Sequence, residues 1–185
     1  NMLILLGKTS SGKDAVKNKL VKDYGFRPIV TYTTRPMRPK ETDGITYHFI
    51  SEEDFKAKIE DGFFLEYKKY HTEQGIWYYG SSWQDYERSD DKTVIILTPS
   101  GYEDFLRELP DVKHTSIYLY ANNTTIKNRL IKRGDSKDEA ERRLKSDNRD
   151  FKDAQALAQK IVYNNAGARL EDVCNKILEY METSN

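Results

Sequence analysis

A short apolar run followed at once by a glycine-rich loop is the feature that most restricts how this chain can fold. Residues 2–6 read MLILL, and residues 7–16 read GKTSSGKDAV. Gly7, Gly12 and Lys13 stand at the spacing of the P-loop, G-x-x-x-x-G-K-[ST]. In that motif a buried strand leads into the loop, a helix follows, and the backbone N–H groups between them bind phosphate oxygens. The segment therefore predicts a strand–loop–helix unit that binds nucleotide phosphates.

The loop departs from the motif at its last position, where Asp14 replaces the residue whose hydroxyl contacts Mg²⁺. A carboxylate oxygen is also a ligand that Mg²⁺ prefers, so we expect Asp14 to bind the metal directly or through a water molecule. The apolar run 94–97 ends at Thr98, with no carboxylate where many P-loop enzymes have an acidic residue. We hypothesise that Asp14 supplies the charge that this strand end lacks.

Apolar runs alternate with helical patterns along the chain, which predicts an α/β fold: a P-loop core whose parallel β-sheet is flanked by helices. A capping box at Ser51 indicates the start of one helix, and Asn122 or Asn123 caps another. The expected strands are 2–6, 29–33, 93–97, 115–120 and 160–163, and the expected helices are 13–23, 52–61, 123–132, 137–159 (as one helix or two) and 170–181.

The segment 41–80 differs from this pattern, because aromatic residues lie among glycines and charges. Such short aromatic strands predict a small mixed α+β lobe inserted into the core. The segment 137–159 has so little apolar content that much of it must face solvent, as a helical lid does. The predicted parts of one compact folding unit are a core of 1–33, 87–132 and 155–185, a nucleotide-binding lobe of 34–86 and a lid of 133–154.

The composition restricts partners and location. Thirty basic and thirty acidic residues give a formal net charge of zero, which argues against a nonspecific nucleic-acid binder. No apolar run approaches the ~20 residues of a membrane span, and no secretory signal pattern precedes Gly7, so we expect a cytoplasmic protein. Cys174 is the only cysteine and falls in the apolar pattern of the last helix, which predicts a buried side chain. The oligomeric state stays open between monomer and dimer.

The residues that follow the P-loop resemble the guanylate kinase family. Residues 31–38 read TYTTRPMR, and the letters expected next in that family's signature follow in order. The resemblance continues to the C-terminal part of the chain and spans nearly all of it. The later matches are Glu41, Asp43-Gly44, Tyr47-His48-Phe49, Phe64-Leu65-Glu66-Tyr67, Tyr78-Tyr79-Gly80-Ser81, Arg129-Leu130, Arg133-Gly134 and Arg142-Arg143-Leu144.

This resemblance implies transfer of the γ-phosphoryl group of ATP to GMP or dGMP, with Mg²⁺ as cofactor. Arg35 and Arg38 match residues that bind the nucleotide phosphate, and arginine suits bidentate phosphate contacts. Glu66 matches the carboxylate that accepts from guanine N1 and N2, so AMP would leave it unpaired. The implied GMP-binding residues are Thr31, Arg35, Arg38, Tyr47, Glu66, Tyr79 and Ser81; the implied ATP-binding residues are Gly7, Lys8, Thr9, Ser10, Ser11, Gly12, Lys13, Asp14 and Asn164; and the implied catalytic residues are Lys13, Arg35, Arg133 and Arg143.

Some positions depart from the family pattern, and two other functions stay open. Ser10 and Lys40 replace glycines, and Met37 replaces a proline. Arg142 is either a second lid arginine or part of a charged helix surface. The alternatives to a guanylate kinase are a guanylate kinase-like module that binds partners without catalysis, and a kinase of another small molecule. Retention of the P-loop and the lid arginines argues against the module, and Glu66 argues against another acceptor.

Overall fold

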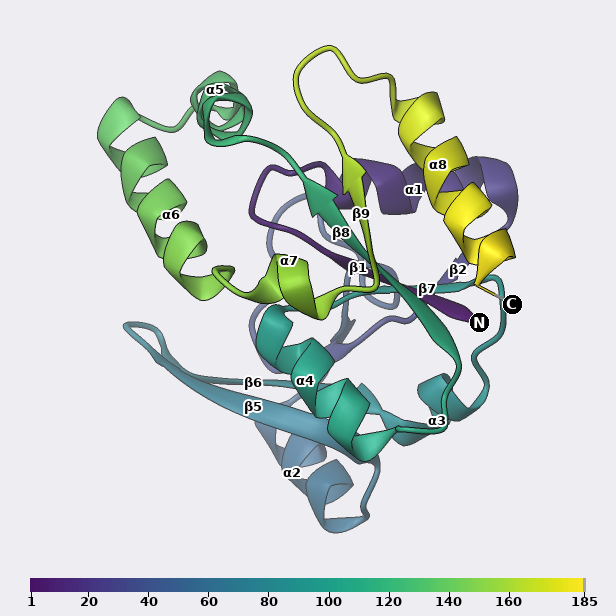
Figure 1. The fold of residues 1–185 in the computed structure, drawn as a ribbon. Helices are drawn as coiled ribbons and strands as arrows, with labels where there is room; N and C mark the ends of the chain where they lie inside the picture. The colour runs from purple at the N-terminus through teal and green to yellow at the C-terminus, as the bar shows by residue number, and fades with distance from the viewer. Residues whose placement is uncertain (185) are drawn as a thin grey trace. The chain divides into compact units, whose positions relative to one another are not determined.

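The computed structural model describes residues 1–184 and divides the chain into two compact units (Figure 1). Unit 1 consists of Asn1–Pro28 together with the chain from Asp90 onward, and unit 2 is Ile29–Ser89. The segment 133–154 lies within unit 1, and the expectation that it moves as a lid stays a prediction. Within residues 1–184, no helix has the length and apolar character needed to cross a membrane.

Unit 1 is built on a five-stranded sheet in the order β2-β7-β1-β8-β9. All of its strand pairs are parallel, as the sequence predicted. Every residue of β1 is buried, which fits a central strand that is covered on both faces and therefore reads as a continuous apolar run. The strands are β1 (Met2–Leu6), β2 (Arg27–Pro28), β7 (Thr93–Ile96), β8 (His114–Tyr120) and β9 (Lys160–Tyr163).

Helices cover both faces of this sheet (Figure 1). On one face α1 and α8 pack in a core cluster that includes Leu3, Leu20 and Ile177. On the other face the Tyr102 hydroxyl of α4 donates to Ser116 Oγ of β8 at 2.9 Å. Cys174 is buried in α8, as predicted. The helices are α1 (Lys13–Tyr24), α4 (Pro99–Glu108), α5 (Asn123–Arg133), α6 (Lys137–Asp150), α7 (Ala154–Leu157) and α8 (Leu170–Thr183), so the charged segment 137–159 forms two helices rather than one.

The strand expected at 29–33 does not form as a single element. Arg27 and Pro28 pair with β7 in unit 1, whereas Tyr32 and Thr33 pair within unit 2. Pro28 has no N–H group and cannot continue a hydrogen-bonded ladder. The apolar residues after it therefore connect the two units instead of extending β2.

Unit 2 contains a mixed four-stranded sheet in the order β4-β3-β6-β5. The β3–β4 pair is parallel, whereas β3–β6 and β5–β6 are antiparallel. Phe55 of α2 packs on Phe64 and Tyr78 of the sheet, and Ser51 Oγ caps α2 by accepting from Asp54 N at 3.0 Å. The elements are β3 (Tyr32–Thr33), β4 (His48–Phe49), α2 (Glu52–Glu60), β5 (Phe64–Thr72), β6 (Gly75–Ser82) and α3 (Trp83–Glu87), which confirms the mixed α+β character predicted for this segment.

Candidate active site

The P-loop of unit 1 runs from the end of β1 to the first turn of α1. Ser10 and Gly12 have φ angles of 56° and 99°, in the left-handed region. Backbone in such conformations turns successive N–H groups to one side, where they form a concave site for an anion. A Cβ atom at Gly12 would lie 2.3 Å from Asn164 Nδ2, so both the conformation and the space require glycine there. The loop therefore has the geometry that the motif predicted.

Lys13 lies across the loop that precedes it. Its Nζ atom donates to the carbonyl of Gly7 and, at 2.9 Å, to that of Lys8. Burial lowers the pKa of Lys13, while Asp14 and Asp147 act in the opposite direction by attracting the ammonium charge. The ammonium group is thus held beside the loop N–H groups, where a phosphate oxygen could replace a carbonyl as its partner.

Two residues from distant parts of unit 1 hold the loop by its carbonyl groups. Asn164, at the end of β9, donates from Nδ2 to Ser11 O at 2.9 Å. Arg129 of α5 donates from Nη1 to Ser10 O at 3.0 Å and from Nη2 to Asn164 O at 2.9 Å. These bonds hold the carbonyl groups of Ser10 and Ser11, while the N–H group of Ser11 donates to Lys8 O at 3.1 Å within the loop. The predicted contact of Asn164 with ATP stays a prediction, because its amide is used here by the loop itself.

Ser11 carries a buried hydroxyl that has no hydrogen-bond partner within residues 1–184. An unpaired buried hydroxyl destabilises the folded state, so Ser11→Ala should raise the free energy of unfolding by about 1 kcal/mol. Ser116→Ala is the matched control, because its hydroxyl accepts from Tyr102 and from Gln159 N, each at 2.9 Å. That substitution should lower stability by about 1 kcal/mol. Urea denaturation measures both changes, and a loss of stability in Ser11→Ala would contradict the assignment.

The two positions that the sequence singled out for the metal ion, Asp14 and Thr98, differ in their surroundings. Asp14 is exposed in the first turn of α1, directly after Lys13. Thr98 Oγ1 instead caps α4 by accepting from Gly101 N at 3.1 Å. Within the described chain, no three His, Cys, Asp or Glu side chains gather as a metal-binding group. A carboxylate beside a phosphate-binding loop fits the oxygen ligands that Mg²⁺ prefers, with phosphate oxygens completing the set.

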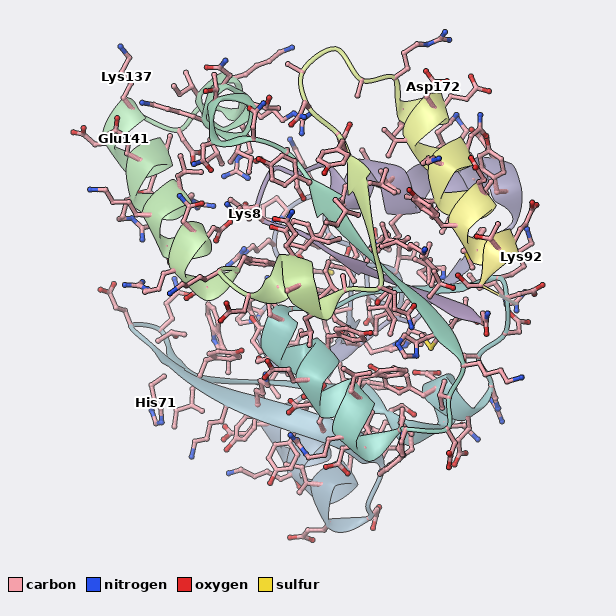
Figure 2. All side chains as sticks on the ribbon, in the orientation of Figure 1. Lys8, His71, Lys92, Lys137, Glu141 and Asp172 are labelled. Atoms are coloured by element: carbon pink, nitrogen blue, oxygen red, sulfur yellow. The ribbon has the colours of Figure 1, made fainter. Side chains whose placement is uncertain are left out.

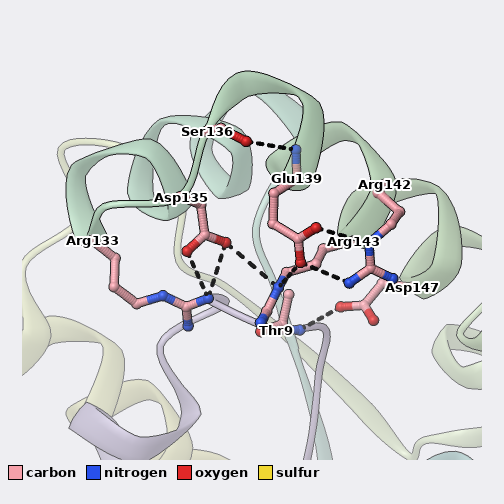
Figure 3. A network of polar contacts seen from close by, with 8 residues as sticks. All are labelled: Thr9, Arg133, Asp135, Ser136, Glu139, Arg142, Arg143 and Asp147. Atoms are coloured by element: carbon pink, nitrogen blue, oxygen red, sulfur yellow. Dashed lines mark hydrogen bonds and ion pairs between the residues drawn. The ribbon is translucent and has the colours of Figure 1, made fainter.

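The arginines predicted to act from 133–154 are paired with carboxylates of the same segment (Figure 3). Arg133 Nη2 lies 3.2 Å from Asp135, and Arg143 Nε lies 3.1 Å from Glu139 and 3.5 Å from Asp135. Arg142 also pairs with Glu139, and these contacts hold the pKa of Glu139 down at about 2. The arginine side chains are 41–66% exposed and that of Glu139 is 37% exposed, whereas that of Asp135 is only 15% exposed. Loss of the contacts with Glu139 should therefore cost little, whereas release of Arg133 and Arg143 would leave the largely buried carboxylate of Asp135 without its partners.

The predicted base-binding residues of unit 2 meet on two neighbouring strands. Glu66 of β5 and Ser81 of β6 are register partners, and Ser81 Oγ donates to Glu66 Oε1 at 2.8 Å. Tyr86 of α3 donates to Ser81 Oγ at 3.4 Å and extends the chain of hydroxyls. The carbonyl of Thr31 accepts from His48 N at 2.8 Å, and the contact of Thr31 with the base stays a prediction. Glu66 thus keeps an oriented, acceptor-only carboxylate.

The predicted phosphate-binding residues of unit 2 gather around a buried guanidinium. Arg35 is 5% exposed and donates from both Nη atoms to Glu41, each at 2.8 Å. Its Cζ atom lies 5.4 Å from the ring centroid of Tyr47, whose ring meets that of Tyr79 edge-on at 5.9 Å. Arg38 is exposed, and its backbone N–H donates to Glu41 Oε1 at 2.8 Å. Glu41 therefore orients this loop, a role that the sequence pattern alone did not reveal.

The Arg35–Glu41 pair should make the folding of unit 2 depend on pH. Arg35 lowers the pKa of Glu41 from its ordinary value of 4.5 to about 2. The carboxylate form then favours the folded state above pH ~4.5, and this stability is lost as the pH falls towards ~2. The difference in unfolding free energy between the wild type and Glu41→Gln should shrink across that range. Glu60→Gln on α2 is the control, since Glu60 makes no ion pair within residues 1–184; a constant difference for Glu41→Gln would contradict the pairing.

Known proteins share both the sequence and the fold of this chain. The family model described as Guanylate kinase matches residues 1–184. The chain is 36% identical to the guanylate kinase of Sulfurimonas denitrificans over 157 residues, which are 81% of this chain and 73% of that protein. It is also 36% identical to that of Helicobacter pylori over 150 residues, 78% of this chain and 70% of the relative.

Two solved structures share the fold. The crystal structure of guanylate kinase from Anaplasma phagocytophilum matches with a TM-score of 0.70 at 20% identity, covering 99% of this chain and 85% of that one. Shikimate kinase from Bacteroides thetaiotaomicron matches with a TM-score of 0.52 at 17% identity and 98% coverage of each chain. At these identities the structures show the fold alone, whereas the family model and the relatives show membership. The chain belongs to the guanylate kinase family of ATP-dependent nucleoside monophosphate kinases.

Proposed function

We propose that this chain transfers the γ-phosphoryl group of ATP to GMP or dGMP and releases ADP with GDP or dGDP. The observation that carries the proposal is the Glu66–Ser81 pair at 2.8 Å in a chain whose P-loop keeps Gly7, Gly12 and Lys13. A carboxylate accepts the two N–H groups on one edge of guanine, and adenine offers no matching pair of donors. The base would therefore be selected in unit 2, and the triphosphate would bind in unit 1.

The remaining residues have roles that follow from their charges. The loop N–H groups and Lys13 would bind the β- and γ-phosphates, and Arg35, Arg38, Tyr47 and Tyr79 would hold the phosphate of GMP. Phosphoryl transfer requires positioning and charge stabilisation more than covalent chemistry, so Arg133 and Arg143 would act by neutralising the transferred group. Mg²⁺ would neutralise phosphate charge beside Asp14, directly or through water. ATP and GMP are thus the proposed partners, with no nucleic acid, in the cytoplasm.

A coupled assay of ADP formation tests the proposal with GMP, dGMP, AMP, shikimate and no acceptor. Turnover with the guanine nucleotides alone is the expected result. Tight GMP binding without turnover would instead indicate a binding module, and turnover with another acceptor would indicate a different kinase of this fold. Turnover that needs no acceptor would show ATP hydrolysis and would also contradict the proposal.

A further inference from the structure

We propose that Asp147 of α6 is an internal ligand of the P-loop, which a phosphate of ATP must displace in order to bind. The proposal rests on the proposed function only in taking ATP as the ligand of that loop. Thr9 N, in the middle of the loop, donates to Asp147 Oδ2 at 2.6 Å (Figure 3). The neighbouring Asn148 accepts from Lys8 Nζ. Two successive side chains of α6 are therefore bonded to two successive residues of the loop.

The contact takes a group that ATP would need. Carboxylate and phosphate oxygens are both anionic acceptors. A backbone N–H that donates to a carboxylate is therefore not available to a phosphate. Burial lowers the pKa of Lys8 and of Lys13, and Asp147 partly offsets this lowering by attracting both ammonium groups. The carboxylate thus lies within the positive field that the loop would offer to phosphates. Binding of Asp147 and binding of a phosphate at Thr9 N are mutually exclusive.

The position of Asp147 in its own helix points to the same role. Asp147 lies in the last turn of α6, where the helix dipole disfavours a negative charge. Figure 2 shows Lys137 and Glu141 on the side of α6 away from the sheet, and Lys8 on the side towards it. In residues 1–184 the hydrogen bond to Thr9 N is the one polar bond that the Asp147 side chain makes. The contact with the loop, and not the position in the helix, therefore stabilises the charge of the Asp147 carboxylate.

Calorimetric titration with inorganic tripolyphosphate, without GMP, tests the proposal. Removal of a competing charged hydrogen bond in Asp147→Ala should lower the dissociation constant about tenfold, and Asp147→Asn should lower it less. Asp138→Asn is the matched control, because Asp138 is exposed on α6 and makes no side-chain bond within residues 1–184. Its dissociation constant should match that of the wild type. An unchanged or weaker affinity in both Asp147 variants would overturn the proposal.

Amide hydrogen exchange of the nucleotide-free protein supplies a second readout. The Thr9 amide should exchange faster in Asp147→Ala than in the wild type or Asp138→Asn, because its acceptor is gone. Equal exchange in all three would show that Asp147 does not occupy the loop. The two proposals can fail separately. If the wild type does not phosphorylate GMP but Asp147→Ala binds tripolyphosphate more tightly than the wild type does, the proposed function is overturned and this inference stands.

Discussion

Replacing Glu66 by glutamine should lower kcat/KM for GMP about 100-fold and leave the KM for ATP within about twofold of its wild-type value. The carboxylate of Glu66 offers acceptor oxygens alone, and Ser81 donates to one of them at 2.8 Å. A glutamine amide directs two N–H donors where guanine also has donors. One hydrogen bond to guanine is lost and a repulsive contact replaces it. The substitution should therefore lower kcat/KM for GMP much more than it changes the KM for ATP.

Initial rates measured across a matrix of ATP and GMP concentrations separate the two constants for Glu66→Gln. Glu73→Gln is the control, since Glu73 is an exposed acid in the turn between β5 and β6 of the same hairpin. Its kinetics should match those of the wild type. Equal losses in kcat/KM for both nucleotides would mean that Glu66 does not recognise the base. Turnover of AMP by the wild type as fast as that of GMP would lead to the same conclusion.

Replacing Lys13 by methionine should lower kcat about 100- to 1000-fold, because in the proposed reaction a preorganised charge beside the transferred group is worth about 3–4 kcal/mol in the transition state. Methionine keeps the length and apolar stem of the lysine but removes its ammonium group. That group now donates to the carbonyls of Gly7 and Lys8 and is placed beside the phosphate site. Loss of kcat should therefore exceed any rise in the KM for ATP.

Lys19→Met in the same helix is the control for Lys13→Met. Lys19 forms an exposed ion pair with Asp23 at 2.8 Å, far along α1 from the loop, and its loss should leave the steady-state constants unchanged. Circular dichroism and thermal melting establish that both variants are folded. A folded Lys13→Met protein with wild-type kcat would show that the loop binds phosphate without contributing to transfer.

Local sequence signals predicted most of the elements correctly. The P-loop spacing, the cap at Asn122 and the left-handed stop at Gly134 each act over a few residues, so a short window contains the whole cause. The strand expected at 29–33 failed because Ile29 and Val30 have the composition of a strand, whereas Pro28 and the change of sheet decide their path. The aromatic pattern of 41–80 indicated the mixed sheet of unit 2, but not its strand order.

The sequence by itself determined the family, because the P-loop glycines and the later motifs stand at spacings that a short stretch defines; the roles of Glu66 towards guanine and of the arginines towards phosphates stay predictions from those motifs. Only the tertiary structure decided how these groups are held. Arg129 and Asn164 reach the loop carbonyls, and Asp147 reaches the loop N–H of Thr9, across more than a hundred residues of chain. No local pattern encodes such contacts, because they come from three elements, β9, α5 and α6, that only the fold brings to the loop. Burial also lowers the pKa of Lys13, since desolvation depends on the packing around a group and not on its neighbours in sequence.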